Sequence, residues 1–177
     1  MRRCLIPLFV IGLTVSGCAM FQTIIKSSFP YTTTLTVAAS SQPGVESSAV
    51  SMATSFDQNF SKNGNTASKI TLVRVISAKL VSISPPTFNI GNIASVKVYL
   101  SKKDGSDEIL IASRDDIEEN AGNNITLDFD DSKFLDELVR QRGIRVRMVY
   151  KMRNYISNDV NLDLILGLAA YPVQEKK

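Results

Sequence analysis

Two runs near the C-terminal end of the chain alternate apolar and polar residues with a period of two. The apolar set of the first run is Ile144, Val146, Met148, Tyr150 and Met152. The apolar set of the second run is Val160, Leu162, Leu164, Leu166, Leu168 and Ala170. Successive side chains of a β-strand point to opposite faces, so each run predicts a strand with one face in a core. Two such strands in succession favour a sheet that packs against another sheet.

Further strands are predicted upstream of this pair. Runs rich in β-branched residues, with turn residues between them, indicate strands at 31–39, 48–54, 69–84, 93–101, 109–113 and 125–129. The run at 69–84 is unusually long and has apolar residues on both parities, which predicts a bulge or a strand that changes sheets. The chain is therefore predicted to be mainly β, an antiparallel β-sandwich of about seven or eight strands.

One short helix is predicted over about 132–142. Phe134, Leu135, Leu138 and Val139 form an apolar stripe at helical spacing. Asp131 or Ser132 is positioned to cap the first turn, and Gly143 ends the pattern. A helix of about ten residues is marginal alone, so we expect it to cover a sheet edge or one end of the sandwich.

The N-terminal residues have the pattern of a secretory signal. Arg2 and Arg3 open the chain, an apolar run covers residues 5–15, and small residues follow. The sequence Val15-Ser16-Gly17-Cys18 resembles the lipobox of bacterial lipoproteins. That resemblance implies that Cys18 is lipidated and that residues 1–17 are removed, so that Cys18 becomes the mature N-terminus.

This interpretation divides the chain into a signal peptide (1–17), a lipidated tether (18–30), a β-sandwich (31–173) and a polar tail (174–177). Ala19 and Met20 follow the cysteine, without the aspartate that retains such lipoproteins in an inner membrane. The resemblance therefore implies a lipid-anchored protein of the bacterial cell envelope, in the outer membrane and facing the periplasm. The order of strands also resembles small β-sandwich envelope lipoproteins of uncharacterised function, a likeness that supplies no active residues.

Charge and cysteine content narrow the function classes. Two of the 20 basic residues, Arg2 and Arg3, lie in the predicted signal, which leaves 18 basic residues against 17 acidic ones. This balance gives no overall case for nucleic-acid binding. Cys4 lies in the signal and Cys18 is the predicted lipid site, so the predicted sandwich has no cysteine for a disulfide.

The polar face of the run at 144–153 carries four cations, Arg145, Arg147, Lys151 and Arg153. Period-two geometry places them in a stripe on one face of a strand. The stripe has two interpretations. It docks an envelope protein or an anionic polymer, or it is a solvated face paired with cross-strand acids such as Asp163. Because no aromatic residue alternates with these charges along the strand, nucleic acid is not an expected partner.

Catalytic and metal motifs are not evident. The chain contains no histidine, and no Gly-x-Ser-x-Gly turn is present. The loop carboxylates do not follow the spacing of an EF-hand. We therefore expect no catalytic residues, no metal and no cofactor.

The sequence favours a non-enzymatic, lipid-anchored binding or assembly module of the cell envelope. One alternative is a small-ligand carrier, with Met148, Tyr150 and Met152 lining a cavity between the sheets. A hydrolase is the third interpretation.

Overall fold

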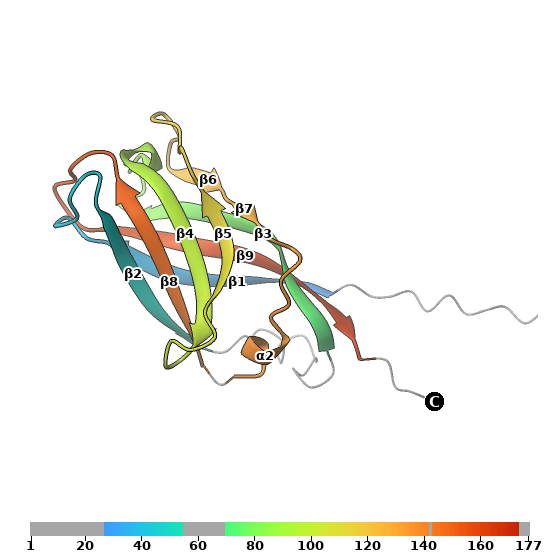
Figure 1. The fold of residues 1–177 in the computed structure, drawn as a ribbon. Helices are drawn as coiled ribbons and strands as arrows, with labels where there is room; N and C mark the ends of the chain where they lie inside the picture. Colours follow the sequence, from blue (N-terminus) through green and yellow to red (C-terminus); the bar gives the residue numbers. More distant parts are fainter. Residues whose placement is uncertain (1–26, 55–69, 142, 174–177) are drawn as a thin grey trace, which may run out of the picture.

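A computed structural model describes residues 27–54, 70–141 and 143–173, which form two stacked antiparallel β-sheets (Figure 1). The four-stranded sheet has the order β1 (Ser27–Val37), β9 (Val160–Pro172), β3 (Ile70–Ser84), β6 (Asn124–Thr126). The five-stranded sheet has the order β2 (Glu46–Thr54), β8 (Gly143–Met152), β4 (Ile93–Lys102), β5 (Ile109–Arg114), β7 (Asp128–Phe129). A 3₁₀ turn, η2 (Ile90–Asn92), precedes β4, and a short helix, α2 (Asp136–Val139), precedes β8. The predicted antiparallel β-sandwich is confirmed.

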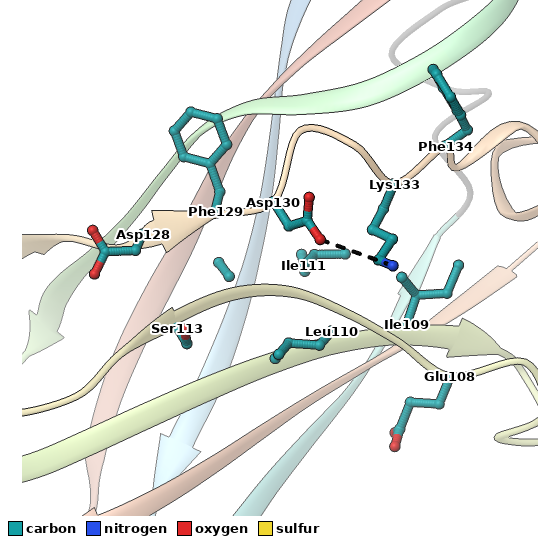
Figure 2. A pocket seen from close by; sticks show the side chains of 11 residues that line it. Glu108, Ile109, Leu110, Ile111, Ser113, Asp128, Phe129, Asp130, Lys133 and Phe134 are labelled. Carbon is teal, nitrogen blue, oxygen red and sulfur yellow. Dashed lines mark ion pairs between the residues drawn. The ribbon is translucent and has the colours of Figure 1, made fainter.

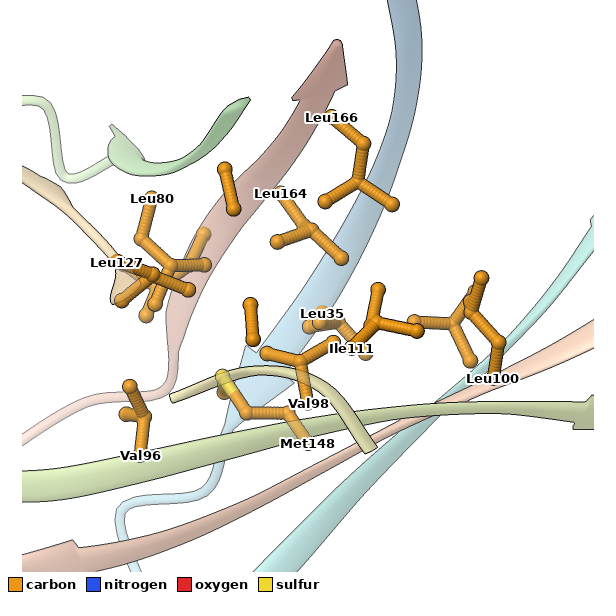
Figure 3. Packing of buried hydrophobic residues seen from close by; sticks show 14 of the residues in the cluster. Leu35, Leu80, Val96, Val98, Leu100, Ile111, Leu127, Met148, Leu164 and Leu166 are labelled. Carbon is orange, nitrogen blue, oxygen red and sulfur yellow. The ribbon is translucent and has the colours of Figure 1, made fainter. Parts of the chain in front are cut away.

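The core lies between the sheets and includes the apolar sets of β8 and β9 that the alternation predicts. Leu164 and Leu166 of β9 face Val98 of β4 and Met148 of β8 across it (Figure 3). Met148 and its neighbours on β8, Tyr150 and Met152, belong to this packed core and are at most 2% exposed.

Strand β3 is irregular, as its mixed parity predicts. Its register with β9 shifts between Thr71 and Arg74, between Val75 and Ser77, and between Ser82 and Ser84. Leu72, in the first irregularity, has a φ of 54° and an exposed side chain. These shifts bring apolar residues of both parities into the core, because a bulge moves the residues after it to the opposite face.

Residues 124–139 close the side of the sandwich between β3 and β5. The segment first pairs with β3 as β6, and the backbone N–H of Leu127 donates to Ala78 O (2.9 Å). It then pairs with β5 as β7 and returns to β3, where the N–H of Leu135 donates to Val73 O (2.7 Å). The run predicted as one strand at 125–129 is therefore two short pieces, one in each sheet.

The predicted helix over 132–142 is wrong in its extent, because α2 spans only the four residues Asp136–Val139. The N-cap is Leu135 and not Asp131 or Ser132, and no side chain caps the turn. The Asp130 carboxylate instead accepts hydrogen bonds from the N–H and the hydroxyl of Ser132 (2.9 and 2.5 Å). This local turn and the bond from Leu135 to β3 hold the preceding residues outside a helix.

Strand β1 begins at Ser27, which pairs with Ala170, so the sandwich starts before the predicted boundary at residue 31. Across the residues that the structure describes, we find no helix long and apolar enough to cross a membrane.

Candidate functional site

The outer face of the five-stranded sheet carries three of the four predicted stripe residues. Arg145, Arg147 and Lys151 alternate on β8 with buried neighbours. The register places Val50 of β2 and Tyr99 of β4 on either side of Arg147, and Leu110 of β5 beside Tyr99. A single row of side chains therefore crosses four strands.

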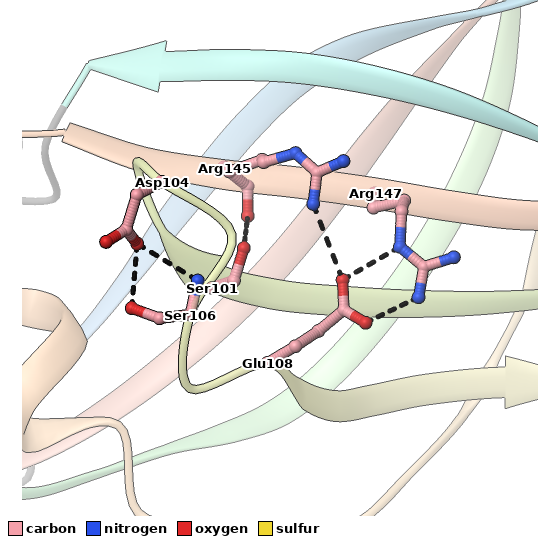
Figure 4. A network of polar contacts seen from close by, with 6 residues as sticks. All are labelled: Ser101, Asp104, Ser106, Glu108, Arg145 and Arg147. Carbon is pink, nitrogen blue, oxygen red and sulfur yellow. Dashed lines mark hydrogen bonds and ion pairs between the residues drawn. The ribbon is translucent and has the colours of Figure 1, made fainter.

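Arg147 and Arg145 share one carboxylate on this face. Arg147 Nε donates to Glu108 Oε1 (2.8 Å) and its NH2 donates to Oε2 (2.5 Å), a bidentate pair (Figure 4). Arg145 NH1 lies 3.7 Å from Glu108 Oε1. The hydrogen bonds from Arg147, with the charges of both guanidinium groups, lower the pKa of the Glu108 carboxyl. The three side chains form an ionic cluster on the outer face of the sheet.

The ring of Tyr99 packs against Arg147 of this cluster. The guanidinium carbon of Arg147 lies 4.6 Å from the centre of the Tyr99 ring, a cation–π contact. An aromatic residue thus contacts the stripe from the neighbouring strand, although none alternates with the cations along β8 itself. The contact orients the plane of the Arg147 guanidinium. Glu108 holds the same guanidinium through two hydrogen bonds.

Arg153, the fourth residue of the predicted stripe, has a structural role. It lies just beyond β8, where NH1 donates to Gly91 O (2.6 Å) and NH2 donates to Ile117 O (2.7 Å). Its guanidinium therefore joins the η2 turn to the loop after β5. Lys151 has no ion pair among the residues that the structure describes.

Asp163, which the sequence suggested as a partner of the stripe, lies on β9 in the other sheet. It accepts a hydrogen bond there from Thr34 Oγ1 (2.6 Å). The acidic partner of the stripe is Glu108, which stands directly before β5. In the sequence, Glu108 is one of the loop carboxylates between the predicted strands at 93–101 and 109–113. The pairing of β5 with β4, and of β4 with β8, brings it next to Arg147.

Other loop carboxylates also bind protein groups. Asp104 accepts from the N–H and hydroxyl of Ser106 (3.0 and 2.7 Å), and these bonds lower its pKa. Asp107 pairs with Lys102, and Asp128 lies 3.5 Å from Arg114. No group of three potential metal ligands occurs within 27–54, 70–141 and 143–173.

Exposed apolar side chains surround the ionic cluster. Val50 and Met52 of β2 are 47% and 51% exposed, and Leu110 of β5 is 40% exposed. The residues that share this surface are named here the docking face: Val50, Met52, Tyr99, Leu110, Glu108, Arg145 and Arg147. The opposite face of the molecule differs, because Thr34 and Thr36 of β1 donate to polar side chains of β9.

A groove of about 570 Å³ runs along β5 next to the docking face (Figure 2). One wall is β5, and the other is the part of the closing segment from β7 to the residue before Leu135. The lining residues are Glu108, Ile109, Leu110, Ile111, Ala112, Ser113, Asp128, Phe129, Asp130, Lys133 and Phe134. We call this the β5 groove. It was not predicted from the sequence, because it depends on where residues 130–134 leave β5.

Cys18, the predicted lipid site, lies outside the described residues, as do the whole predicted signal and most of the tether. Its lipidation stays a prediction.

No protein-family model matches the chain, and no curated protein matches its sequence. Among solved structures, the chain is similar to one from the virus-like particle of the giant freshwater prawn Macrobrachium rosenbergii extra small virus. The TM-score is 0.31 at 10% identity, over 98% of this chain and 88% of that one. It is also similar to a chain of Desmodium yellow mottle tymovirus, with a TM-score of 0.30 at 10% identity, over 99% of this chain and 98% of that one. TM-scores this low indicate neither a shared family nor a shared function.

Proposed function

We propose that this chain is a non-enzymatic, lipid-anchored protein of the bacterial cell envelope whose sandwich docks a partner protein. The anchor is the lipid on Cys18, and the location is the periplasmic side of the outer membrane. The contact surface is the docking face. The proposal for the anchor rests on the lipobox, and the proposal for the contact surface rests on the side chains of the five-stranded sheet.

The observation that carries the docking proposal is the row Val50, Arg147, Tyr99 and Leu110. Arginine, tyrosine and methionine are enriched in protein interfaces, and apolar side chains there lose water on binding. Here Arg147 is already fixed by Glu108 and Tyr99. Little side-chain entropy is therefore lost when a partner covers it.

A partner protein fits this face better than an anionic polymer. Arg145 and Arg147 already share the carboxylate of Glu108, which neutralises part of their charge. A polymer would have to compete with that carboxylate, whereas a protein surface can bury Val50 and Met52 and leave the cluster intact.

Site-specific photo-crosslinking in intact cells tests the docking face. A crosslinker at Met52 of the full-length chain is expected to give an adduct with a partner protein, and Val50→Asp is expected to abolish that adduct by placing a charge in the contact. A crosslinker at Ile83, which is similarly exposed on β3, and the substitution Thr32→Asp on β1 are the matched controls. Equal adducts from positions 52 and 83, or an adduct that survives Val50→Asp, contradict the proposal.

Charge reversal at Arg145 and Arg147 is a poor test of docking. It would place two new carboxylates beside Glu108, so a lost interaction could result from a damaged fold. Substitutions at the exposed apolar positions avoid this ambiguity.

The anchor is tested separately by intact-mass measurement of the membrane fraction. The expected species begins at Cys18 and carries a diacylglyceryl group. A chain that begins at Met1 contradicts the lipid anchor and the proposed location, while the crosslinking result stands on its own.

A further inference from the structure

The N-terminal half of β5 is a sheet edge. On one side β5 pairs with β4 from Val96 to Leu100. On the other side its ladder with β7 holds only the pairs Ala112↔Phe129 and Ser113↔Asp128. Beyond that ladder, the described residues form one further backbone hydrogen bond to this side of β5, a long one from the N–H of Asp130 to Ile111 O (3.4 Å). Ile109 and Leu110 therefore have no strand partner on this side within the described part of the chain.

The chain leaves this edge by a defined route. The Asp130 carboxylate turns the backbone through its bonds to Ser132. Leu135 then donates to Val73 O on β3, in the other sheet. Residues 130–134 are held at one end by the Asp130 turn and at the other by the bond from Leu135 to β3. The β5 groove lies between this segment and β5 (Figure 2).

The groove offers apolar contacts on both walls. Leu110 lies on the β5 side, and Phe129 and Phe134, 40% and 50% exposed, lie on the opposite side. Its volume of about 570 Å³ lies within the range of roughly 300–1,000 Å³ that is usual for ligand pockets. Phenylalanine side chains exposed beside an open sheet edge are an association hazard unless something covers them.

The charged groups at the rim are already paired. Glu108 binds Arg145 and Arg147, Asp128 lies 3.5 Å from Arg114, and Asp130 lies 4.0 Å from Lys133. Charge complementarity therefore favours an occupant without net charge. Among the described residues, no second strand pairs with β5 at Ile109 and Leu110, and a sheet edge of this kind favours an extended backbone over a compact small molecule.

We propose that the β5 groove binds an extended, uncharged, apolar peptide segment of the partner protein, which adds as a strand to Ile109–Ile111 and continues the line of β7. This inference rests on the proposed docking function and names the part of the partner that is bound. Leu110 belongs to both the groove and the docking face, so a partner on that face is positioned to insert such a segment. Pairing of β5 with β5 of a second copy of this chain is the alternative, and crosslinking at position 134 distinguishes it from peptide binding.

The test uses the full-length chain in detergent and a fluorescent seven-residue peptide of alternating valine and threonine. We expect saturable binding, with slower hydrogen exchange at the amides of residues 109–111. Phe134→Asp is expected to weaken binding roughly tenfold, because it places a charge on the apolar wall. Val45→Asp, a similarly exposed position before β2, is the matched control and is expected to leave binding unchanged. Equal urea unfolding midpoints for both variants show that the fold is intact.

A peptide methylated at every backbone nitrogen separates strand addition from side-chain binding. Strand addition predicts that methylation abolishes binding, because the peptide can no longer donate to the edge. Equal binding of the methylated peptide, absence of binding, or unchanged exchange at residues 109–111 overturns the inference. A complex of two copies through position 134, detected by crosslinking, also overturns it.

Failure of this inference is distinguishable from failure of the docking proposal. Val50 lies on β2 and does not line the groove, so Val50→Asp is expected to leave peptide binding unchanged. A persistent adduct from Met52 without peptide binding removes only the groove inference. Peptide binding without that adduct removes the docking face alone.

Discussion

At the scale of single residues, Glu108 determines how much positive charge the predicted basic stripe presents. Without it, Arg145 and Arg147 would present two free cations on the sheet. With it, they form a cluster in which each side chain is about a quarter exposed. The surface is therefore less basic than the sequence of β8 alone suggests.

Glu108→Gln is expected to lower the free energy of unfolding by about 0.5–1 kcal/mol at pH 7, the usual range for a well-formed surface pair. The pKa of Glu108 is lowered in the folded state. Its stabilising contribution is therefore complete above the unfolded pKa of roughly 4.3 and is lost as the pH falls through the folded value. Urea unfolding of both proteins from pH 7 to pH 2.5 measures this, and a difference that stays constant with pH contradicts it.

At the scale of elements, Asp136 joins α2 to the irregular start of β3. Its two carboxylate oxygens accept hydrogen bonds from the N–H groups of Leu72 (2.8 Å) and Val73 (3.2 Å). Leu72 has a positive φ, which is unfavourable for a branched side chain. A single side chain thus satisfies two donors that the register shift removes from the ladder.

Asp136→Ala is expected to destabilise the protein by about 1–2 kcal/mol, because two backbone donors lose their acceptor. Hydrogen exchange at Leu72 and Val73 is expected to increase in the same variant. Glu137→Ala is the control, since that neighbouring side chain is exposed. Similar losses of stability in the two variants would show that Asp136 has no special role.

The strands were predictable because alternation is a local signal. Strands β8 and β9 follow the alternation without interruption. In β3, apolar residues at both odd and even positions indicated the register shifts that the structure shows. The helix was overestimated because Phe134 and Leu135 fit a helical stripe, although Phe134 is exposed and Leu135 bonds to β3 instead. Tertiary hydrogen bonds overrode local preference there.

The candidate site was only partly predictable for a related reason. The sequence identified Arg145, Arg147 and Lys151 as one face of a strand, which the structure shows. Their partners depend on register between strands that are distant in sequence, as do the row through Tyr99 and the β5 groove. Arg153 was assigned to the stripe by its spacing alone. Its hydrogen-bond acceptors, the carbonyls of Gly91 and Ile117, are distant in sequence, and no local pattern indicates them.

At the scale of the whole molecule, the four-stranded sheet is assembled from both ends of the sandwich. Strand β9 lies between β1 and β3 and pairs with both along most of its length (Figure 1). Its leucines at 162, 164, 166 and 168 are fully buried. Among the strands that the structure describes, β1 and β3 are joined in this sheet through β9.

A chain truncated after residue 159 is therefore expected to show no cooperative urea unfolding transition, because the sheet and a large part of the core are missing. A chain truncated after residue 173, which keeps β9, is the control and is expected to unfold like the full-length protein. Circular dichroism at increasing urea concentrations measures both. A cooperative transition in the shorter chain contradicts this account of the sheet.

The position of β9 also limits when the sandwich can be completed during synthesis of the chain. A polypeptide emerges from the ribosome N-terminus first, so the strand that joins β1 to β3 is the last of the nine described strands to be made. Until then the four-stranded sheet is incomplete, because among the described strands β9 is the one that pairs with both β1 and β3.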